Sequence, residues 1–173
     1  MLLIALHAMP AFAQQTVVPS SAPEPVAPAA KPAPPPPEAR QFDFWLGDWE
    51  VTTPDGKTAG HNRIELILDG RALQEHWSGT GGFVGTSLNV FDTEAKKWRQ
   101  FWIDGTGGSL QLIGGLVDGK MVLEGTGKEA GKILHDRITW TPNPDGSVRQ
   151  LWERSEDERA TWFVVFDGLY RKK

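Results

Sequence analysis

Three histidines stand where side chains from separate strands could meet. His61, His76 and His135 fall on three predicted strands, and imidazoles that converge from different strands can bind a metal ion. None of the three has the paired spacing of a metal-ligand motif, so we expect ordinary strand histidines and no metal site. His76 lies between Glu75 and Trp77 and is therefore the histidine of most interest.

Acid–base chemistry has four candidates, Glu75, Asp136, Arg137 and Glu153. If they point into a cavity, burial beside another charge would shift their pKa values toward those useful in catalysis. On an exposed strand face the same residues are simply solvated, which is the default. The chain contains no cysteine and no G-x-S-x-G or H-E-x-x-H motif. We therefore assign no catalytic residue and favour a binding protein over an enzyme.

Two glycine-rich runs superficially resemble phosphate-binding loops, at 104–108 (DGTGG) and 79–82 (GTGG). A phosphate loop ends in Lys-Ser/Thr and leads into a helix, whose N-terminal dipole favours the anion. Each run here lies between predicted strands instead. Both are expected to be turns, and no cofactor is expected.

The elements that must position these residues are predicted to be β-strands. Six Asp-Gly pairs divide the chain after residue 45, and Asp-Gly supplies the positive φ angles of tight hairpin turns. The segments between them are rich in Trp, Val, Ile, Leu, Phe and Thr. Only 40–46 is predicted to be helical, as a short apolar turn. The predicted strands are 47–53, 58–68, 72–78, 83–91, 97–104, 109–117, 120–127, 132–141, 147–155 and 160–167.

This series of strands predicts an all-β fold, an up-and-down antiparallel barrel of about ten strands. A flat sheet of that width would expose two edges and an apolar face, so closure is expected. Short connections favour up-and-down order. A ten-strand barrel is wider than the eight-strand barrels that can just hold one small ligand, so an internal cavity is expected.

Alternation along the strands indicates which side chains could line that cavity. Gln100 shares one strand face with Trp102, and Gln150 shares another with Trp152. Aromatic rings mixed with amides suit a pocket with apolar walls and a few orienting polar groups. The alternative, that these amides face solvent, stays open. The predicted ligand contacts are Trp77, Trp102 and Trp152 as walls, with His76, Asn89, Gln100, Arg137 and Gln150 as polar groups.

A family resemblance spans residues 41–171. The stretch at 42–51, FDFWLGDWEV, resembles the opening of a bacterial family of unknown function placed among the lipocalin-like (calycin) barrels. Further matches lie at 75–78 (EHWS), 87–91 (SLNVF), 98–104 (WRQFWID) and the closing Tyr170-Arg171. The resemblance implies a lipocalin-like barrel but no activity, since the family has none established.

Within the opening, Gly47-Asp48-Trp49 is similar to the G-x-W signature of lipocalins. The resemblance implies that Trp49 lies on the first strand near the closed barrel end, where Arg171 packs on its ring by cation–π stacking. Gly47, Trp49 and Arg171 would then be structural residues. Relatives in the superfamily bind small apolar molecules, and a related ten-strand group binds haem through a late histidine. Haem is not expected here, because no histidine follows His135.

The N-terminal segment predicts export. An apolar run at 2–9 precedes Ala11-Phe12-Ala13, which fits a signal-peptidase site, so 1–13 is predicted to be a signal peptide. The run is too short to span a membrane. Residues 14–40 are predicted to be a disordered Pro/Ala-rich spacer, and 41–173 to be one barrel domain. A periplasmic or secreted location is expected.

Charge narrows the range of partners. The chain has 18 Lys+Arg against 22 Asp+Glu, a net charge of −4, and no basic cluster, which disfavours nucleic acid and anionic membrane surfaces. The leading hypothesis is an exported lipocalin-like protein that holds a small, largely apolar ligand in its lumen. Two alternatives stay open: a non-catalytic envelope scaffold, and a hydrolase or isomerase acting on a lipid-like substrate. The oligomeric state is also left open.

Overall fold

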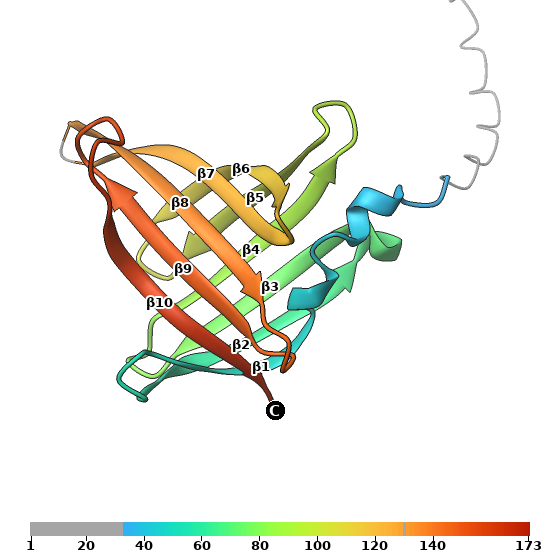
Figure 1. Cartoon of the computed structure of the whole chain (residues 1–173), viewed down its shortest axis with the longest axis horizontal. Coiled ribbons are helices and arrows are strands. Elements are labelled where there is room, and N and C mark those ends of the chain that lie inside the picture. Colours follow the sequence, from blue (N-terminus) through green and yellow to red (C-terminus); the bar gives the residue numbers. More distant parts are fainter. Residues whose placement is uncertain (1–32, 130) are drawn as a thin grey trace, which may run out of the picture. The chain divides into compact units, whose positions relative to one another are not determined.

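The computed structural model describes residues 33–129 and 131–173 (Figure 1). The predicted signal peptide and the spacer up to residue 32 lie outside the described residues. Contacts group Pro34–Lys173 into one unit. It begins with two short 3-10 helices, η1 (Pro37–Arg40) and η2 (Asp43–Trp45), and a third, η3 (Leu68–Gly70), connects two strands.

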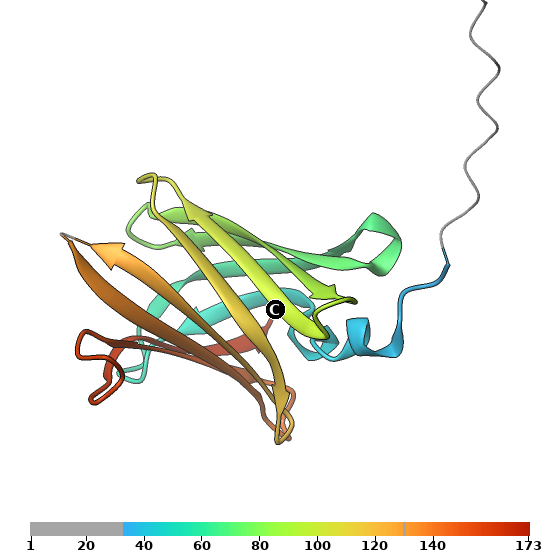
Figure 2. The same ribbon diagram turned by 90° about the horizontal axis from the view of Figure 1, so that it is seen from above.

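Ten antiparallel strands close into a barrel (Figures 1 and 2). Each strand pairs with the next along the chain, and the first pairs with the last. The predicted all-β, up-and-down barrel is confirmed. The strands are β1 (Gly47–Thr52), β2 (Thr58–Ile67), β3 (Ala72–Gly79), β4 (Val84–Asp92), β5 (Lys97–Asp104), β6 (Ser109–Val117), β7 (Lys120–Glu129), β8 (Lys132–Pro142), β9 (Val148–Ser155) and β10 (Phe163–Lys172).

The last strand differs most from its prediction. The Asp-Gly pair at 167–168 predicted a turn, yet it lies within β10. A Cβ atom at Gly168 would lie 2.6 Å from the ring of Phe166 and 2.9 Å from the side chain of Val51. Close packing inside the barrel, and not a turn, therefore requires glycine at this position.

An aromatic cluster closes one end of the barrel beneath η1 and η2. Phe42 and Trp45 are fully buried, and their rings stack with centroids 4.9 Å apart. Phe42 also meets the edges of Trp98 at 5.6 Å and Trp140 at 5.2 Å. The helical turn predicted at 40–46 is confirmed, in the form of short 3-10 helices.

Helix η1 belongs to the barrel unit although its residues lie in the predicted spacer. Ala39 is buried in the core. Arg40 donates a hydrogen bond from Nη2 to the carbonyl oxygen of Gly70 at 2.6 Å. The contact joins η1 to η3, the connection between β2 and β3 at the same end of the barrel.

Trp49 is buried on β1, and its Nε1 donates to the carbonyl oxygen of Trp45 at 2.9 Å. The cation over its ring is Lys172, whose Nζ lies 5.3 Å from the ring centroid. The expectation that Arg171 fills this position is wrong by one residue, because Lys172 is the register partner of Trp49 and Arg171 points to the opposite face of β10. Gly47 has a φ of 132°, a conformation that favours glycine.

Candidate functional site

A cavity of about 330 Å³ opens at the barrel end opposite the helices η1 and η2. Its rim includes Gly81 and Phe83 of the turn between β3 and β4. The volume lies at the lower end of the range for small-molecule pockets. Seven of its sixteen lining residues are aromatic: Trp77, Phe83, Trp102, Trp140, Trp152, Phe166 and Tyr170.

Strand alternation turns the three predicted wall residues into this cavity. Trp77 on β3, Trp102 on β5 and Trp152 on β9 all line it. Trp102 packs over Gly85 of β4, where a Cβ atom would lie 2.1 Å from the indole ring. Trp152 is held by its own polar atom, because Nε1 donates to Oδ1 of Asp136 at 2.7 Å. Both rings are therefore fixed by neighbours outside the cavity lining.

A buried carboxyl group lies deeper in the cavity. Glu75 on β3 is 5% exposed, and its Oε1 accepts a hydrogen bond from Nδ2 of Asn62 at 2.7 Å. Its Oε2 accepts one from the hydroxyl of Ser87 at 2.6 Å. Asn62 Nδ2 also lies 3.3 Å from the hydroxyl of Tyr170, and that hydroxyl donates to Oε1 of Gln150.

The hydrogen-bond chain continues in the other direction. Asn89 donates from Nδ2 to the Ser87 hydroxyl at 2.9 Å, and Gln100 donates from Nε2 to Oδ1 of Asn89 at 2.8 Å. The chain thus crosses six strands, and its two end residues, Gln100 and Gln150, both line the cavity. We call these residues the polar floor: Asn62, Glu75, Ser87, Asn89, Gln100, Gln150 and Tyr170.

Burial controls the protonation of the polar floor. It raises the pKa of Glu75 from an ordinary 4.5 to about 7, although the hydrogen bonds from Ser87 and Asn62 act in the opposite direction. Burial, with the nearby charge of Glu75, raises the pKa of Tyr170 well above 10. Near neutral pH, Glu75 therefore exchanges a proton while the Tyr170 phenol keeps its own.

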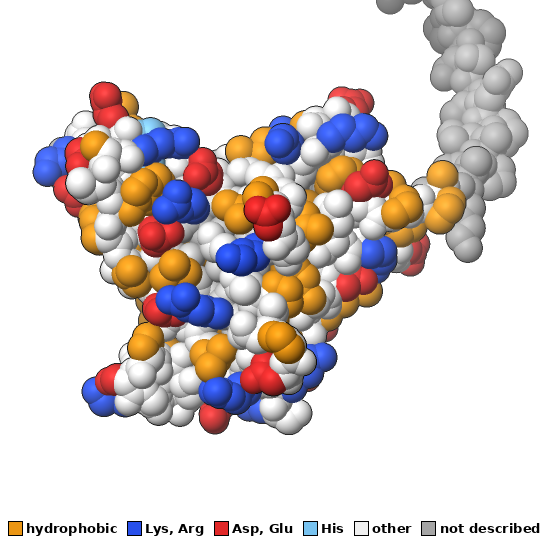
Figure 3. All heavy atoms as spheres, viewed as in Figure 1, with side chains coloured by type: hydrophobic (Ala, Val, Ile, Leu, Met, Phe, Trp, Pro, Cys, Tyr) orange, Lys and Arg blue, Asp and Glu red, His pale blue; other side chains and the backbone are white. Residues whose placement is uncertain are grey.

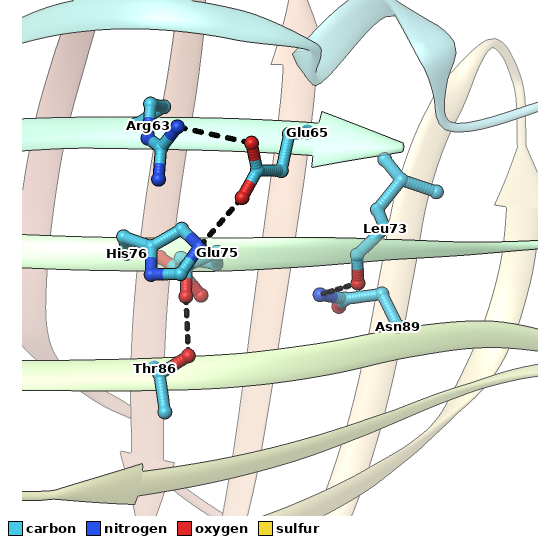
Figure 4. Close-up of polar contacts among 7 residues, drawn as sticks. All are labelled: Arg63, Glu65, Leu73, Glu75, His76, Thr86 and Asn89. Atoms are coloured by element: carbon cyan, nitrogen blue, oxygen red, sulfur yellow. Dashed lines mark hydrogen bonds and ion pairs between the residues drawn. The ribbon is translucent and has the colours of Figure 1, made fainter. Parts of the chain in front are cut away.

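His76 lies outside the cavity, contrary to its prediction as a ligand contact. It is the neighbour of Trp77 on β3, so the two side chains point to opposite faces of the sheet. Its Nε2 lies 3.0 Å from Oε1 of Glu65 on β2, as Figure 4 shows. The same carboxylate accepts a hydrogen bond from Arg63 at 3.0 Å. His76 therefore belongs to a charged cluster on the outer face.

Arg137 is also on the outer face, since it alternates along β8 with the buried Asp136 and Ile138. Figure 3 shows positive and negative side chains interspersed on the face of the molecule that it draws. Its Nη2 lies 3.0 Å from Oε2 of Glu153, and its guanidinium carbon lies 4.2 Å from the ring centroid of Trp162. The face of β8 that points inward instead carries Ile138 and Trp140, both lining the cavity. The prediction that Arg137 orients a ligand there is corrected accordingly.

Of the four acid–base candidates, Glu75 alone lines the cavity. Asp136 is 1% exposed and accepts from Nε of Arg154 at 2.9 Å, so it is a paired carboxylate that also holds Trp152. Glu153 pairs with Arg137 outside. Glu75 differs from both because its side chain accepts hydrogen bonds from Asn62 and Ser87, which are uncharged.

The sequence-based list of ligand contacts omitted Tyr170, which lines the cavity, and the buried Asn62 and Ser87, which lie behind the lining. It included Asn89, which is fully buried and does not line the cavity; Asn89 instead accepts the hydrogen bond from Gln100. The sequence did contain a signal for Asn62. It lies between His61 and Arg63 on β2, so strand alternation points its side chain to the face opposite these two residues. Tyr170 was noted only as part of a closing motif, because the turn predicted at 167–168 excluded it from a strand. Ser87 gave no signal of its own, since its importance comes from the carboxylate on the neighbouring strand.

A second hollow, about 650 Å³ in volume, is lined by outward residues of β4 to β7 and also by two buried residues, Leu112 and Gln100 of the polar floor. Its apolar residues include Leu88, Phe101 and Ile113, which are 42–48% exposed. Arg99, Glu124 and Arg159 also line it. The lumen is the stronger candidate site, because it combines enclosure by aromatic rings with a buried and hydrogen-bonded polar floor.

No protein-family model and no curated protein matches this chain. Within residues 33–129 and 131–173, no helix is long and apolar enough to cross a membrane. The same residues contain no group of three or more His, Cys, Asp or Glu side chains that could hold a metal ion.

Proposed function

We propose that this protein is an exported, lipocalin-like binding protein that holds a small, largely apolar ligand in the barrel lumen. The observation that carries the proposal is the cavity of about 330 Å³, with aromatic walls at its rim and hydrogen-bonding groups at its floor. Burying about 200 Å² of apolar ligand surface would contribute about 5 kcal/mol before the cost of association. The floor would then orient the polar end of the ligand.

Binding of a neutral apolar dye tests this proposal. N-Phenyl-1-naphthylamine should brighten when mixed with the protein, and octan-1-ol should displace it. Leu110→Trp fills part of the cavity and should abolish the enhancement, whereas Leu88→Trp places the same ring on the outer face of β4 and should preserve it. Direct excitation of the dye avoids interference from the added indole. Equal dye binding by both variants would refute lumen binding.

An enzymatic role has one observation in its favour, a carboxyl group with a pKa of about 7 inside a cavity. The geometry favours binding, because both oxygens of Glu75 already accept hydrogen bonds from Asn62 and Ser87. The nearest titratable partner, Tyr170, reaches Glu75 only through Asn62. Hydrolysis of 4-nitrophenyl butyrate should therefore proceed equally with the wild type and Glu75→Gln. A rate that falls in the variant would favour the enzyme.

A further inference from the structure

The cavity is lined by one acidic side chain and by no basic one. Among its sixteen lining residues Glu75 is the only charged type, and Lys, Arg and His are all missing. The floor supplies Glu75 with the amide of Asn62 and the hydroxyl of Ser87, which are both uncharged. A carboxylate held in this way has no positive counter-charge within its hydrogen-bonding shell.

Such a carboxyl group has two ways to avoid the cost of burying an uncompensated charge. It can bind a proton, or it can pair with a cation that enters the cavity. The structure provides for a cation in a second way, because the rings of Trp77 and Trp102 line the space above the floor. The ring of Trp152 already has the guanidinium carbon of Arg154 at 5.4 Å from its centroid. Indole faces attract ammonium groups, and more strongly where water is excluded.

We propose that the cavity selects a protonated organic amine, with the ammonium group near Glu75 and an apolar body between the tryptophans. The inference rests on the proposed function, since it names the chemical class of the ligand for the same cavity. A carboxylic acid of equal size is disfavoured, because its anion would approach Glu75 with no basic residue in the lining to compensate it. A neutral alcohol would gain only the hydrogen bonds of the floor.

The elements around Glu75 make it the group that responds to pH. From β2 and β4 it faces the uncharged Asn62 and Ser87, and from β10 it faces Tyr170, whose pKa lies well above 10. The inward Asp136 of β8 is already bonded to Arg154 of β9. An ammonium group would lower the pKa of Glu75 from about 7, so binding should release a proton.

Three probes with the same eight-carbon tail test the inference by calorimetry: octylammonium, octan-1-ol and octanoate. At pH 7.5 octylammonium should bind at least about tenfold more tightly than octan-1-ol, and octanoate should bind most weakly. The affinity for octylammonium should fall between pH 7.5 and 5.5, and that for octan-1-ol should not. Enthalpies measured in buffers of different ionisation heat should show proton release with octylammonium alone.

Glu75→Gln should reduce the preference for octylammonium over octan-1-ol to about one. Glu65→Gln removes a carboxylate on the outer face and should keep the preference. If Glu75→Gln fails to fold, two measurements on the wild type still test the amine proposal: the order of affinities for the three probes, and the proton release on binding octylammonium. Tighter binding of octan-1-ol or octanoate would overturn the amine proposal and leave lumen binding standing. Failure of all three probes to bind would overturn both.

Discussion

Glu75 couples the stability of the barrel to pH. Its pKa is about 7 in the folded protein and an ordinary 4.5 in the unfolded chain, so between these values the folded state binds the extra proton. The free energy of unfolding contributed by Glu75 is therefore fully present below about pH 4.5 and decreases as pH rises through 7. A shift of this size corresponds to about 3 kcal/mol.

Glu75→Gln imitates the protonated side chain and should remove this dependence. Urea unfolding at pH 5 and pH 8 should show the wild type losing about 3 kcal/mol more than the variant over this interval. Glu65→Gln, which changes an exposed carboxylate, should follow the wild type. If all three proteins lose the same free energy of unfolding, Glu75 is not the titrating group.

Gly85 determines the position of one cavity wall. An alanine Cβ there would lie 2.1 Å from the Trp102 ring and 3.0 Å from the carbonyl oxygen of Ile103, so the ring has to move. Gly85→Ala should cost about 1–3 kcal/mol of stability and weaken dye binding about tenfold. Gly81→Ala is the control, because Gly81 lines the cavity and has open space at its Cβ. Equal dye affinities in the two variants would contradict the conclusion that Gly85 determines the position of the Trp102 ring.

Single residues were predicted from the sequence only where a strand face was known. Trp77, Trp102 and Trp152 line the cavity, while His76 could not have done so together with Trp77, because neighbours on a strand face opposite sides. Arg137 faces outward for the same reason, because its neighbour Ile138 on β8 lines the cavity. The polar floor was not predicted as a unit, since its hydrogen bonds join strands far apart in the sequence and depend on barrel closure.

At the scale of elements, close pairing of β6 with β7 explains one of two adjacent glycines on β6. A Cβ atom at Gly114 would lie 2.0 Å from the carbonyl oxygen of Val122, whereas one at the adjacent Gly115 would have nothing within 4 Å. Gly114→Ala should therefore destabilise the barrel by about 1–3 kcal/mol or more. Gly115→Ala should be neutral or stabilising by up to about 1 kcal/mol, because alanine reduces the conformational entropy of the unfolded chain. Thermal unfolding of the two variants checks the contrast, and similar midpoints would refute it.

The strands were predictable because turn chemistry and hydrophobic alternation are local signals. Asp69-Gly70 forms a connection with φ values of 53° and 81°, as an Asp-Gly turn requires. Asp167-Gly168 carries the same two letters but lies in β10, where contact with Phe166 excludes a side chain. A pair of residues cannot distinguish these two causes, since the second arises from packing against Phe166 on the same strand and Val51 on the neighbouring β1.

At the scale of the whole molecule, closure depends on residues that precede the first strand. Phe42 and Trp45 are fully buried at the closed end, where Phe42 packs against Trp98 and Trp140, and Trp45 packs against Trp140. Truncation of a buried Phe or Trp typically costs about 3–5 kcal/mol each. Their joint contribution is comparable with the total stability of about 5–15 kcal/mol that is typical of a folded domain.

Two truncations separate the barrel unit from the chain before it. Removing residues 1–33 leaves the unit Pro34–Lys173 and should change neither the unfolding midpoint nor dye binding. Removing residues 1–46 deletes η1 and η2 and exposes the rings of Trp98 and Trp140, so it should abolish cooperative unfolding in near-ultraviolet circular dichroism. The shorter truncation serves as the control for loss of the spacer. A cooperative transition in the longer one would show that the ten strands close without their aromatic plug.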